Sequence, residues 1–515
     1  MIYLMSLNIL LSGLFARAYG GTIHDYAHSI VQATDGGYAV AGRTWSFGAG
    51  YVDLLVLKLN STGAIQWART FGGDTSDVAS SIIQTTDGGY AVAGYTLSFG
   101  ASYGSDDFLV IKLNSSGGLQ WAKTFGGTSS DGALSIVQTA DGGYAVAGWT
   151  MSFGAGNDDL LVIKISSAGD LQWARTFGGT GSEVAYSIVQ TTDGGCAVAG
   201  FTTTYGAGDY DFLVIKLNSS GGLEWAKTFG GTSSDGAHSI IQTADGGYAV
   251  GGLTWGFGAG NADFLVLKLS GSGDLEWART FGGANHENLW SIVQAKDGGY
   301  AVAGRTQSFG AGSGDFFVLK LSGSGSLEWA RTLGGTNLDE AQSIVQTTDE
   351  GYAVAGYTYS FGAGSYDLLV LKLGPDGSYP GCVADCSPTV NTPTPSTSSP
   401  SVGANCNPTV IDQTPTSTTP SLTTTDACAP LYVEEDLFGK GFEFRALGHG
   451  IYLYIPEQAQ VSLKIYDAGG RLVQRLYEGV LTSGSHTFSP EIEGRGVYLA
   501  VLGYNGSTIT TRILR

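Results

Sequence analysis

A unit of 52 residues repeats along most of this chain and limits the folds that it can adopt. The unit is marked by a turn motif, Asp-Gly-Gly-Tyr, at residues 35–38. The aspartate of this motif recurs at Asp87, Asp141, Asp193, Asp245, Asp297 and Asp349, in steps of 52 residues with one step of 54. A period of this length without helical patterning is typical of a β-propeller or a solenoid. Seven copies therefore fill residues 19 to about 374.

Each copy is expected to form four short strands. In the third copy they are predicted at Ser135–Thr139, Gly143–Thr150, Leu160–Ile165 and Leu171–Thr176. These segments are rich in Val, Ile, Tyr and Trp, and turn-forming sequences such as DGG and NSSGG separate them. The third is apolar at nearly every position, as expected of a strand covered on both faces. We therefore predict an all-β fold, a seven-bladed β-propeller of four-stranded antiparallel blades, with an open solenoid as the alternative.

The two ends of the repeat array carry competing expectations. The last copy has a third strand at Leu368–Leu373, but no Trp-Ala-Arg-Thr strand follows it. Residues 14–20, LFARAYG, resemble that missing strand, and Phe15 stands where the other copies have Trp. Residues 1–18 also resemble a signal peptide, because an apolar run precedes the cleavage pattern Ala-Arg-Ala. Cleavage after Ala18 would remove the strand and leave residues 378–382 to replace it.

The rest of the chain divides into a linker and a second domain. Residues 374–430 are rich in Thr, Ser and Pro, so they bury too little apolar surface to order, and we predict a disordered linker. Residues 431–515 contain alternating strands and predict a small C-terminal β-sandwich. The linker region holds four cysteines with three alternative pairings, a content that suits an oxidising exterior: Cys382, Cys386, Cys406 and Cys428.

Charge and hydropathy exclude some partners. The formal net charge is −20 and the basic residues are spread over the repeats, so nucleic acid and anionic lipid are not expected to bind. Beyond residues 1–18 no apolar stretch is long enough to span a membrane, so the mature chain is expected to have no membrane-spanning segment. Cys196 stands where other copies have Tyr, and we expect it to be buried and inert.

Two stretches resemble known families. The repeat, with WAKTFGG, SIVQTADGGYAVAG and DLLVIKI, resembles the seven-bladed β-propeller repeat (SBBP type) of exported bacterial and archaeal proteins. The tail, with VSLKIYDAGGRLVQRL, LTSGSHTF and GRGVYLAVLGYNGSTITTRIL, resembles the type A sorting domain of type IX secretion cargo. A similar small sandwich also occurs in flagellar-hook-cap-like proteins. The resemblance implies an extracellular or outer-surface location, with residues 431–515 contacting the secretion machinery.

Two series of acids are expected to form rings on one face of the propeller. The functional interpretation is a cation site, for which Ca²⁺ is the candidate, or a polyol site. The structural interpretation is that each acid accepts backbone N–H bonds in its own loop, or pairs with residues of the Lys58 or Arg69 type. Sevenfold recurrence favours the structural role, and no other cofactor is expected. The inter-blade series is Asp25, Asp77, Asp131, Glu183, Asp235, Glu287 and Asp339, and the series before the third strands is Asp53, Asp107, Asp159, Asp211, Asp263, Asp315 and Asp367.

Two positions on the same face differ between copies, and they are the candidate ligand contacts. Aromatic side chains among carboxylates suit sugar rings, which stack their C–H faces and donate hydroxyl hydrogen bonds. Ordinary loop variation is the alternative explanation. The candidates are His28, Trp45, Tyr186, His238, Trp255, Trp290 and Tyr359.

Catalytic patterns are weak. A Gly-x-Ser-x-Gly pattern at residues 100–104 lacks the helix that a nucleophile elbow needs, and no histidines have metal-ligand spacing. We therefore expect no enzyme, but a secreted or cell-surface binding or adhesion module for an extracellular glycan or a surface protein. The alternatives are a polysaccharide-acting glycosidase or lyase that uses a loop-face carboxylate, and a structural surface-layer component.

Overall fold

The computed structural model describes residues 14–378 except 100–103, 207, 259, 311 and 363–364, and beyond residue 378 mainly strands. The candidate nucleophile elbow, residues 1–13 of the predicted signal peptide and the four linker cysteines lie outside the described residues. The described chain contains strands and turns, and none of it forms a helix that could cross a membrane.

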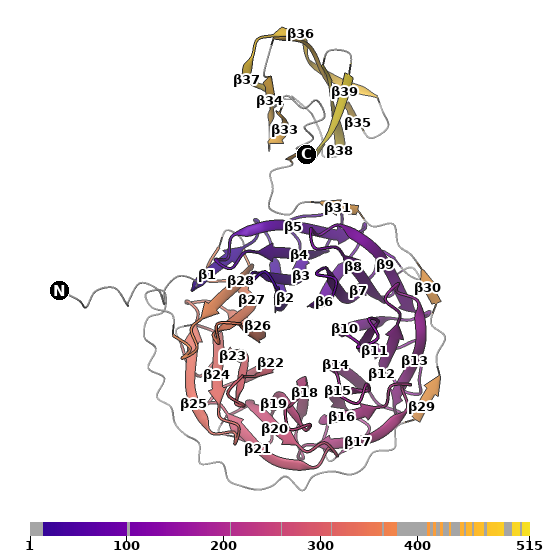
Figure 1. Cartoon of the computed structure of the whole chain (residues 1–515), viewed down its shortest axis with the longest axis vertical. Coiled ribbons are helices and arrows are strands. Elements are labelled where there is room, and N and C mark those ends of the chain that lie inside the picture. Colours follow the sequence, from indigo (N-terminus) through magenta and orange to yellow (C-terminus); the bar gives the residue numbers. More distant parts are fainter. Residues whose placement is uncertain are drawn as a thin grey trace, which may run out of the picture. The chain divides into compact units, whose positions relative to one another are not determined.

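Seven antiparallel sheets stand in a ring, which confirms the predicted seven-bladed propeller (Figure 1). The innermost strands are β2 (Asp25–Gln32), β6 (Asp77–Gln84), β10 (Asp131–Gln138), β14 (Glu183–Gln190), β18 (Asp235–Gln242), β22 (Glu287–Gln294) and β26 (Asp339–Gln346). The second strands are β3 (Tyr38–Thr44), β7 (Tyr90–Thr96), β11 (Tyr144–Thr150), β15 (Cys196–Thr202), β19 (Tyr248–Thr254), β23 (Tyr300–Thr306) and β27 (Tyr352–Thr358). The third strands are β4 (Asp53–Leu59), β8 (Asp107–Leu113), β12 (Asp159–Ile165), β16 (Asp211–Leu217), β20 (Asp263–Leu269), β24 (Asp315–Leu321) and β28 (Asp367–Leu373). The outer strands are β5 (Ile65–Gly72), β9 (Leu119–Gly126), β13 (Leu171–Gly178), β17 (Leu223–Phe229), β21 (Leu275–Phe281) and β25 (Leu327–Leu333).

The seventh blade takes its outer strand from the start of the chain. Strand β1 (Phe15–Tyr19) pairs antiparallel with β28, from Phe15 opposite Lys372 to Tyr19 opposite Leu368. Residues 14–20 thus supply the strand that the last copy lacks (Figure 1). The propeller begins at residue 15, and the boundary predicted at residue 19 is wrong because β1 is part of blade seven.

The apolar core is divided into seven clusters, one at each seam between neighbouring blades. Every residue of each third strand is buried, which matches its continuous apolar sequence. Each blade is too thin to cover its own two faces, so burial requires a neighbour on both sides. The closed ring provides that neighbour for all seven.

The acids expected in loops are instead the first residues of strands. Asp131 begins β10 opposite Thr150, and Asp159 begins β12. The innermost strand is longer than predicted because a β-bulge between Ala133 and Ser135 lets the pairing continue past an irregular point. The same bulge recurs in the other six blades.

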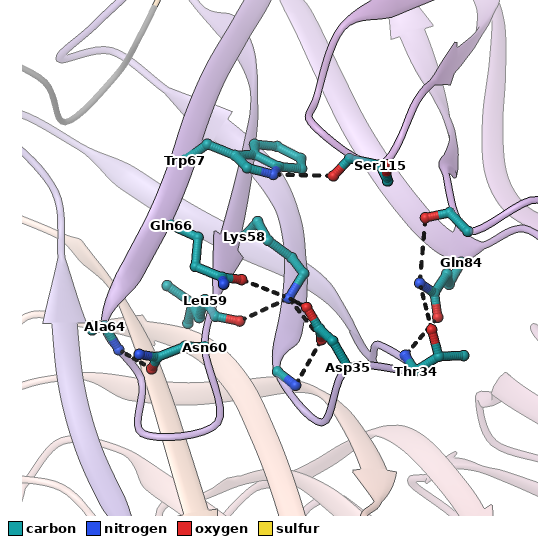
Figure 2. Close-up of polar contacts among 12 residues, drawn as sticks. Thr34, Asp35, Lys58, Leu59, Asn60, Ala64, Gln66, Trp67, Gln84 and Ser115 are labelled. Atoms are coloured by element: carbon teal, nitrogen blue, oxygen red, sulfur yellow. Dashed lines mark hydrogen bonds and ion pairs between the residues drawn. The ribbon is translucent and has the colours of Figure 1, made fainter.

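A buried lysine fastens the turn of each blade to its third strand (Figure 2). Lys58 Nζ donates to Asp35 Oδ2 at 2.8 Å, to the Leu59 carbonyl at 3.0 Å and to Gln66 Oε1 at 2.9 Å. Three acceptors match the three donors of an ammonium group, so the charge is buried without an unpaired proton. The equivalent lysines pair with the turn aspartates of their own blades: Lys112, Lys164, Lys216, Lys268, Lys320 and Lys372.

The Thr/Ser/Pro tract contributes three short strands that lie against outer strands. Strands β29 (Thr409–Asp412), β30 (Thr416–Thr418) and β31 (Thr423–Thr425) pair antiparallel with β13, β9 and β5. This part of the tract was expected to be disordered. Extended, β-branched residues can satisfy the free edge of an outer strand, which composition alone does not reveal.

Residues 428–515 form a separate unit of two four-stranded antiparallel sheets, in agreement with a small β-sandwich. One sheet contains β32 (Tyr432–Val433), β33 (Glu443–Leu447), β34 (Gly450–Ile455) and β37 (Gly484–Phe488). The other contains β36 (Leu472–Leu481), β35 (Ala459–Asp467), β38 (Val497–Tyr504) and β39 (Ser507–Leu514).

Candidate functional site

The two acid series meet in pairs at the seams. A Cβ at Gly72 would lie 2.1 Å from Asp53 Oδ1 and 2.8 Å from Asp77 Oδ2, so this glycine gives room to one acid of each series. Both side chains are buried, and burial, with a contribution from Asp77, raises the pKa of Asp53 to about 6. Burial also raises the pKa of Asp77 and of Asp131.

These acids bind the backbone and hydroxyl groups of the chain. Asp77 accepts the Gly73 N–H at 2.8 Å and the hydroxyls of Thr96 and Ser98. Asp159 accepts the Gly156 N–H at 3.0 Å. The partners recorded for the residues considered as their ion-pair partners are different: Lys58 binds the turn aspartate Asp35, and Arg69 donates to the Ala68 carbonyl. Within the described part of the chain no three His, Cys, Asp or Glu side chains group as metal ligands.

The variable aromatic positions gather at two of the seams. Trp45 and Tyr359 lie where blade seven meets blade one, and Tyr186, His238 and Trp255 lie where blade four meets blade five. Trp290 stacks on His238 at 4.4 Å between ring centroids. His28 lies on β2, and burial lowers its pKa to about 3.

The seam between blades seven and one is filled by its own side chains. The Tyr26 ring lies 4.8 Å from that of Tyr357 and 5.3 Å from that of Tyr366. The Arg43 guanidinium lies 4.8 Å from the Tyr26 centroid and 5.0 Å from that of Trp45. Trp45 therefore packs against the Arg43 guanidinium at this seam.

The seam between blades four and five holds a pocket of about 340 Å³. A volume at the lower end of the range for small-molecule sites is enough for one sugar-sized ring. Trp255 is 50% exposed and Tyr210 is 43% exposed, so both form the rim. Its walls are Tyr186, Phe201, Tyr210, Ser234, Asp235, Gly236, His238, Leu253 and Trp255.

A missing side chain keeps this pocket open. Gly236 occupies the place of Tyr26, one residue after the inter-blade acid, and a Cβ there would meet no atom within 4 Å. Gly132 has the same place in blade three, but a Cβ there would lie 2.6 Å from Trp149 Nε1. The residue opposite Gly236 is Leu253, which is smaller than Trp149, the residue opposite Gly132. Blade five thus combines glycine with a short partner across the strand pair.

The pocket wall contains a carboxylate, a neutral imidazole and a serine hydroxyl. Asp235 is fully buried, and burial raises its pKa, with a contribution from Asp211. Burial lowers the pKa of His238 to about 4, and its Nδ1 lies 2.6 Å from the Leu289 carbonyl. A ligand at neutral pH would meet one carboxylate, a neutral imidazole, the Ser234 hydroxyl and four aromatic side chains, and the lining residues named above include no Lys or Arg.

Trp290 continues this wall along the innermost strands. Its Nε1 donates to Glu340 Oε1 at 2.5 Å, and Arg305 and Gln342 also bind Glu340, at 3.0 and 2.8 Å. Trp290 is thereby held in place against His238. Phe201, Tyr210 and Gly236 were missed from the sequence. A position-by-position comparison of the copies finds glycine at this place in blades three and five, Gly132 and Gly236, but does not show which of the two faces an open space.

Comparisons with known proteins add little to this geometry. No family model matches the chain. The regulatory protein FlaEY of Caulobacter vibrioides is 26% identical over 194 residues, which cover 32% of this chain and 20% of that protein. The chain therefore spans about a fifth of the length of this curated relative.

Solved structures align with this chain at low similarity. Sqt1 from Chaetomium thermophilum has a TM-score of 0.40 at 12% identity, covering 72% of this chain and 89% of that one. The Pan2 WD40 domain of Neurospora crassa has a TM-score of 0.40 at 13% identity, covering 70% and 94%. An endo-1,5-α-L-arabinanase from Thermotoga petrophila has a TM-score of 0.28 at 12% identity, covering 85% and 91%. The propeller assignment rests on the strand pairing of this chain.

Proposed function

We propose that this protein is an exported, non-enzymatic binding module that holds an extracellular glycan in the pocket between blades four and five. The observation that supports the proposal is the pocket itself, with Tyr186, Phe201, Tyr210 and Trp255 around the buried carboxylate of Asp235. Aromatic faces pack against the C–H surfaces of a sugar, and a few fixed polar groups orient its hydroxyls.

The set of acids in the pocket favours binding over catalysis. Most glycoside hydrolases use two carboxyl groups that flank the bond they cleave. The acid in the pocket wall is Asp235, and the carboxylates described outside the pocket are buried and engaged by backbone N–H and hydroxyl groups. Export is proposed from the resemblance of residues 431–515 to a sorting domain, and deletion of these residues should retain the protein inside the producing cell.

A glycan array tests the binding function. The full chain should bind at least one class of glycan, and Trp255→Ala should abolish binding because it removes half of the rim. Trp45→Ala is the matched control, since Trp45 has the same place in blade one but lies in a filled seam. Trp45→Ala should bind as the parent does.

Release of reducing sugar from the bound glycan separates a binding protein from an enzyme. We expect no turnover. Turnover that disappears in Asp235→Asn or Asp131→Asn would support the alternative of a polysaccharide-acting enzyme. A chain that binds no glycan and has no turnover would contradict the proposal and leave the surface-protein or structural alternatives.

A further inference from the structure

A hydroxyl group recurs at one place in six of the seven blades. It belongs to the residue two positions after the threonine that ends each second strand, and it accepts the backbone N–H of the residue 23 positions earlier. The distances range from 2.9 to 3.2 Å. The hydroxyls are those of Ser46, Ser98, Ser152, Thr204, Ser308 and Ser360.

In four blades this hydroxyl also donates to the inter-blade acid. The distance from Oγ to Oδ2 is 2.7 Å in each, for the pairs Ser46–Asp25, Ser98–Asp77, Ser152–Asp131 and Ser360–Asp339. Blades four and six carry glutamate instead, and the longer side chain reaches a backbone N–H at 3.2 Å, from Thr204 and Ser308 respectively. A short acid is thus accompanied by a hydroxyl in these four blades.

Blade five has the short acid without the hydroxyl. Its acid is Asp235, and the residue in the hydroxyl position is Gly256. Asp235 Oδ2 accepts the Gly231 N–H at 2.8 Å, and Asp235 Oδ1 is buried without a hydrogen-bond partner among the described residues. A Cβ at Gly256 would lie 3.4 Å from the Ser233 Cβ, which is ordinary contact, so a serine would fit. The chain leaves open a place for a hydroxyl beside Asp235.

This place adjoins the pocket, because Asp235 and its neighbour Ser234 line the wall together with Trp255. We propose that the pocket receives a single pyranose ring whose hydroxyl takes the place of the missing serine and donates to Asp235. The inference rests on the proposed function and names the part of the glycan that is bound. The ring lies against the aromatic rim, and the hydroxyl points inward to the carboxylate.

An organic cation is the competing occupant, since aromatic faces and a carboxylate also suit an ammonium group. The internal comparison favours the hydroxyl. In the blades with a short acid a hydroxyl binds this oxygen, whereas the cation at the equivalent seam, Arg43, lies over Tyr26 and Trp45. The full chain carries a net charge of −20, so a cation would also be attracted without specific recognition.

Saturation-transfer NMR on the full chain provides the test, with methyl glycosides of glucose, galactose, mannose and N-acetylglucosamine as probes and tetramethylammonium as the cationic probe. At least one glycoside should bind. Gly256→Ser restores the internal hydroxyl and should weaken that binding roughly ten- to hundredfold, the effect of losing a hydrogen bond to a charged group. Gly236→Val, which carries the side chain found at this place in blades two and four, should abolish it.

Deoxy derivatives of the bound glycoside show whether the hydroxyl and Asp235 interact. Removal of the critical hydroxyl should weaken binding to the parent chain but cause no further loss in Gly256→Ser. Unchanged melting temperatures of both glycine variants would show that the fold is retained. Ser98→Gly is the control, because it creates the same vacancy in a seam without this pocket and should leave affinity unchanged.

The following results would contradict the proposed contact between a pyranose hydroxyl and Asp235. If Trp255→Ala abolishes glycan binding and Gly256→Ser does not weaken it, the binding function stands and the hydroxyl contact is wrong. If glycans bind only as polymers and no single-ring glycoside binds, the binding function stands and the single-ring inference is wrong. If tetramethylammonium binds to the parent chain and not to Gly236→Val, the occupant of the pocket is an organic cation and the sugar is wrong. A chain that binds no glycan in any form would contradict both proposals.

Discussion

The Phe15 ring of the first strand lies 5.8 Å from the Tyr38 ring of the first blade, at an interplanar angle of 63°. The corresponding contact between blades one and two joins Trp67 to Tyr90 at 5.9 Å and 68°. Phe15 therefore does at the closing seam what a tryptophan does elsewhere. Tyr19 adds a hydrogen bond of 2.5 Å from its hydroxyl to the Gly63 carbonyl of blade one.

Phe15→Ala is expected to lower the free energy of unfolding by about 3 kcal/mol, the cost of removing a buried aromatic side chain. Phe15 is 5% exposed and belongs to the apolar cluster of the closing seam. Urea denaturation followed by tryptophan fluorescence measures the change. Arg17→Ala, which removes the exposed side chain of β1, should have little effect. Equal stability of Phe15→Ala and the parent would mean that β1 does not close the ring in solution.

N-terminal sequencing of protein recovered from the medium is the companion measurement. Cleavage after Ala18 would remove nearly all of β1, so an exported chain with an intact ring should retain residues 15–19. A mature chain that begins at Tyr19 and is as stable as the uncleaved chain would contradict the closure seen here.

Glu350→Gly is expected to stabilise the protein. Glu350 has a φ of 68°, whereas the six equivalent turns have glycine with φ between 80° and 84°. A left-handed conformation costs a non-glycine residue about 1–2 kcal/mol, and the glycine variant avoids this cost. Glycine also makes the unfolded chain more flexible, which lowers the gain by about 0.4–1 kcal/mol. The net gain should be about 0.5–1 kcal/mol in the free energy of unfolding. Gly88→Ala, the reverse change in an open site, should destabilise by a similar amount.

Cys196→Tyr should also increase stability, by about 1 kcal/mol. Six copies have tyrosine at this position, and in five of them it contacts the tryptophan of the preceding blade edge to face, at 5.7 to 6.0 Å. Cys196 packs near Trp173 and makes no ring contact. Burial raises the pKa of its thiol to about 11, so the thiol is unreactive at neutral pH. A lower melting temperature in the variant would show that neighbours have closed over the smaller side chain.

Low pH should weaken the ion pairs between the turn aspartates and the buried lysines. Hydrogen bonds from Thr139 and Lys164 outweigh partial desolvation and hold the pKa of Asp141 at about 2, below its ordinary value of 3.8. The unfolded chain therefore takes up protons first, and the stabilisation present above about pH 4 is lost as the pH falls towards 2. Asp141 is largely exposed, so solvent screening keeps its contribution to the free energy of unfolding under about 1 kcal/mol.

Urea midpoints between pH 5 and pH 2 test this contribution. Asp141→Asn should be less stable than the parent at pH 5 and should approach it at pH 2. A constant difference across this range would show that the Asp141 carboxylate does not titrate as described.

The sequence predicted the ring well and the pocket only in part. Seven turns, continuous apolar third strands and the resemblance of residues 14–20 to an outer strand were sufficient for the propeller, because each is a property of residues that are present. Trp255, Tyr186 and His238 were found for the same reason. Gly236 and Gly256 were missed because what matters at both is an absent side chain. The copies differ in sequence at both places, but only the surrounding atoms show that the space at Gly236 is open and that a serine would fit at Gly256.

Pairing of β1 with β28 also has a consequence for biosynthesis. A nascent chain cannot complete its last blade until Lys372 has left the ribosome, so residues 15–19 must wait as an unpaired strand while six blades form. During that interval the unfinished seam exposes an apolar edge at each end of the array, and a chaperone that shields either edge would act at the moment of greatest risk of aggregation.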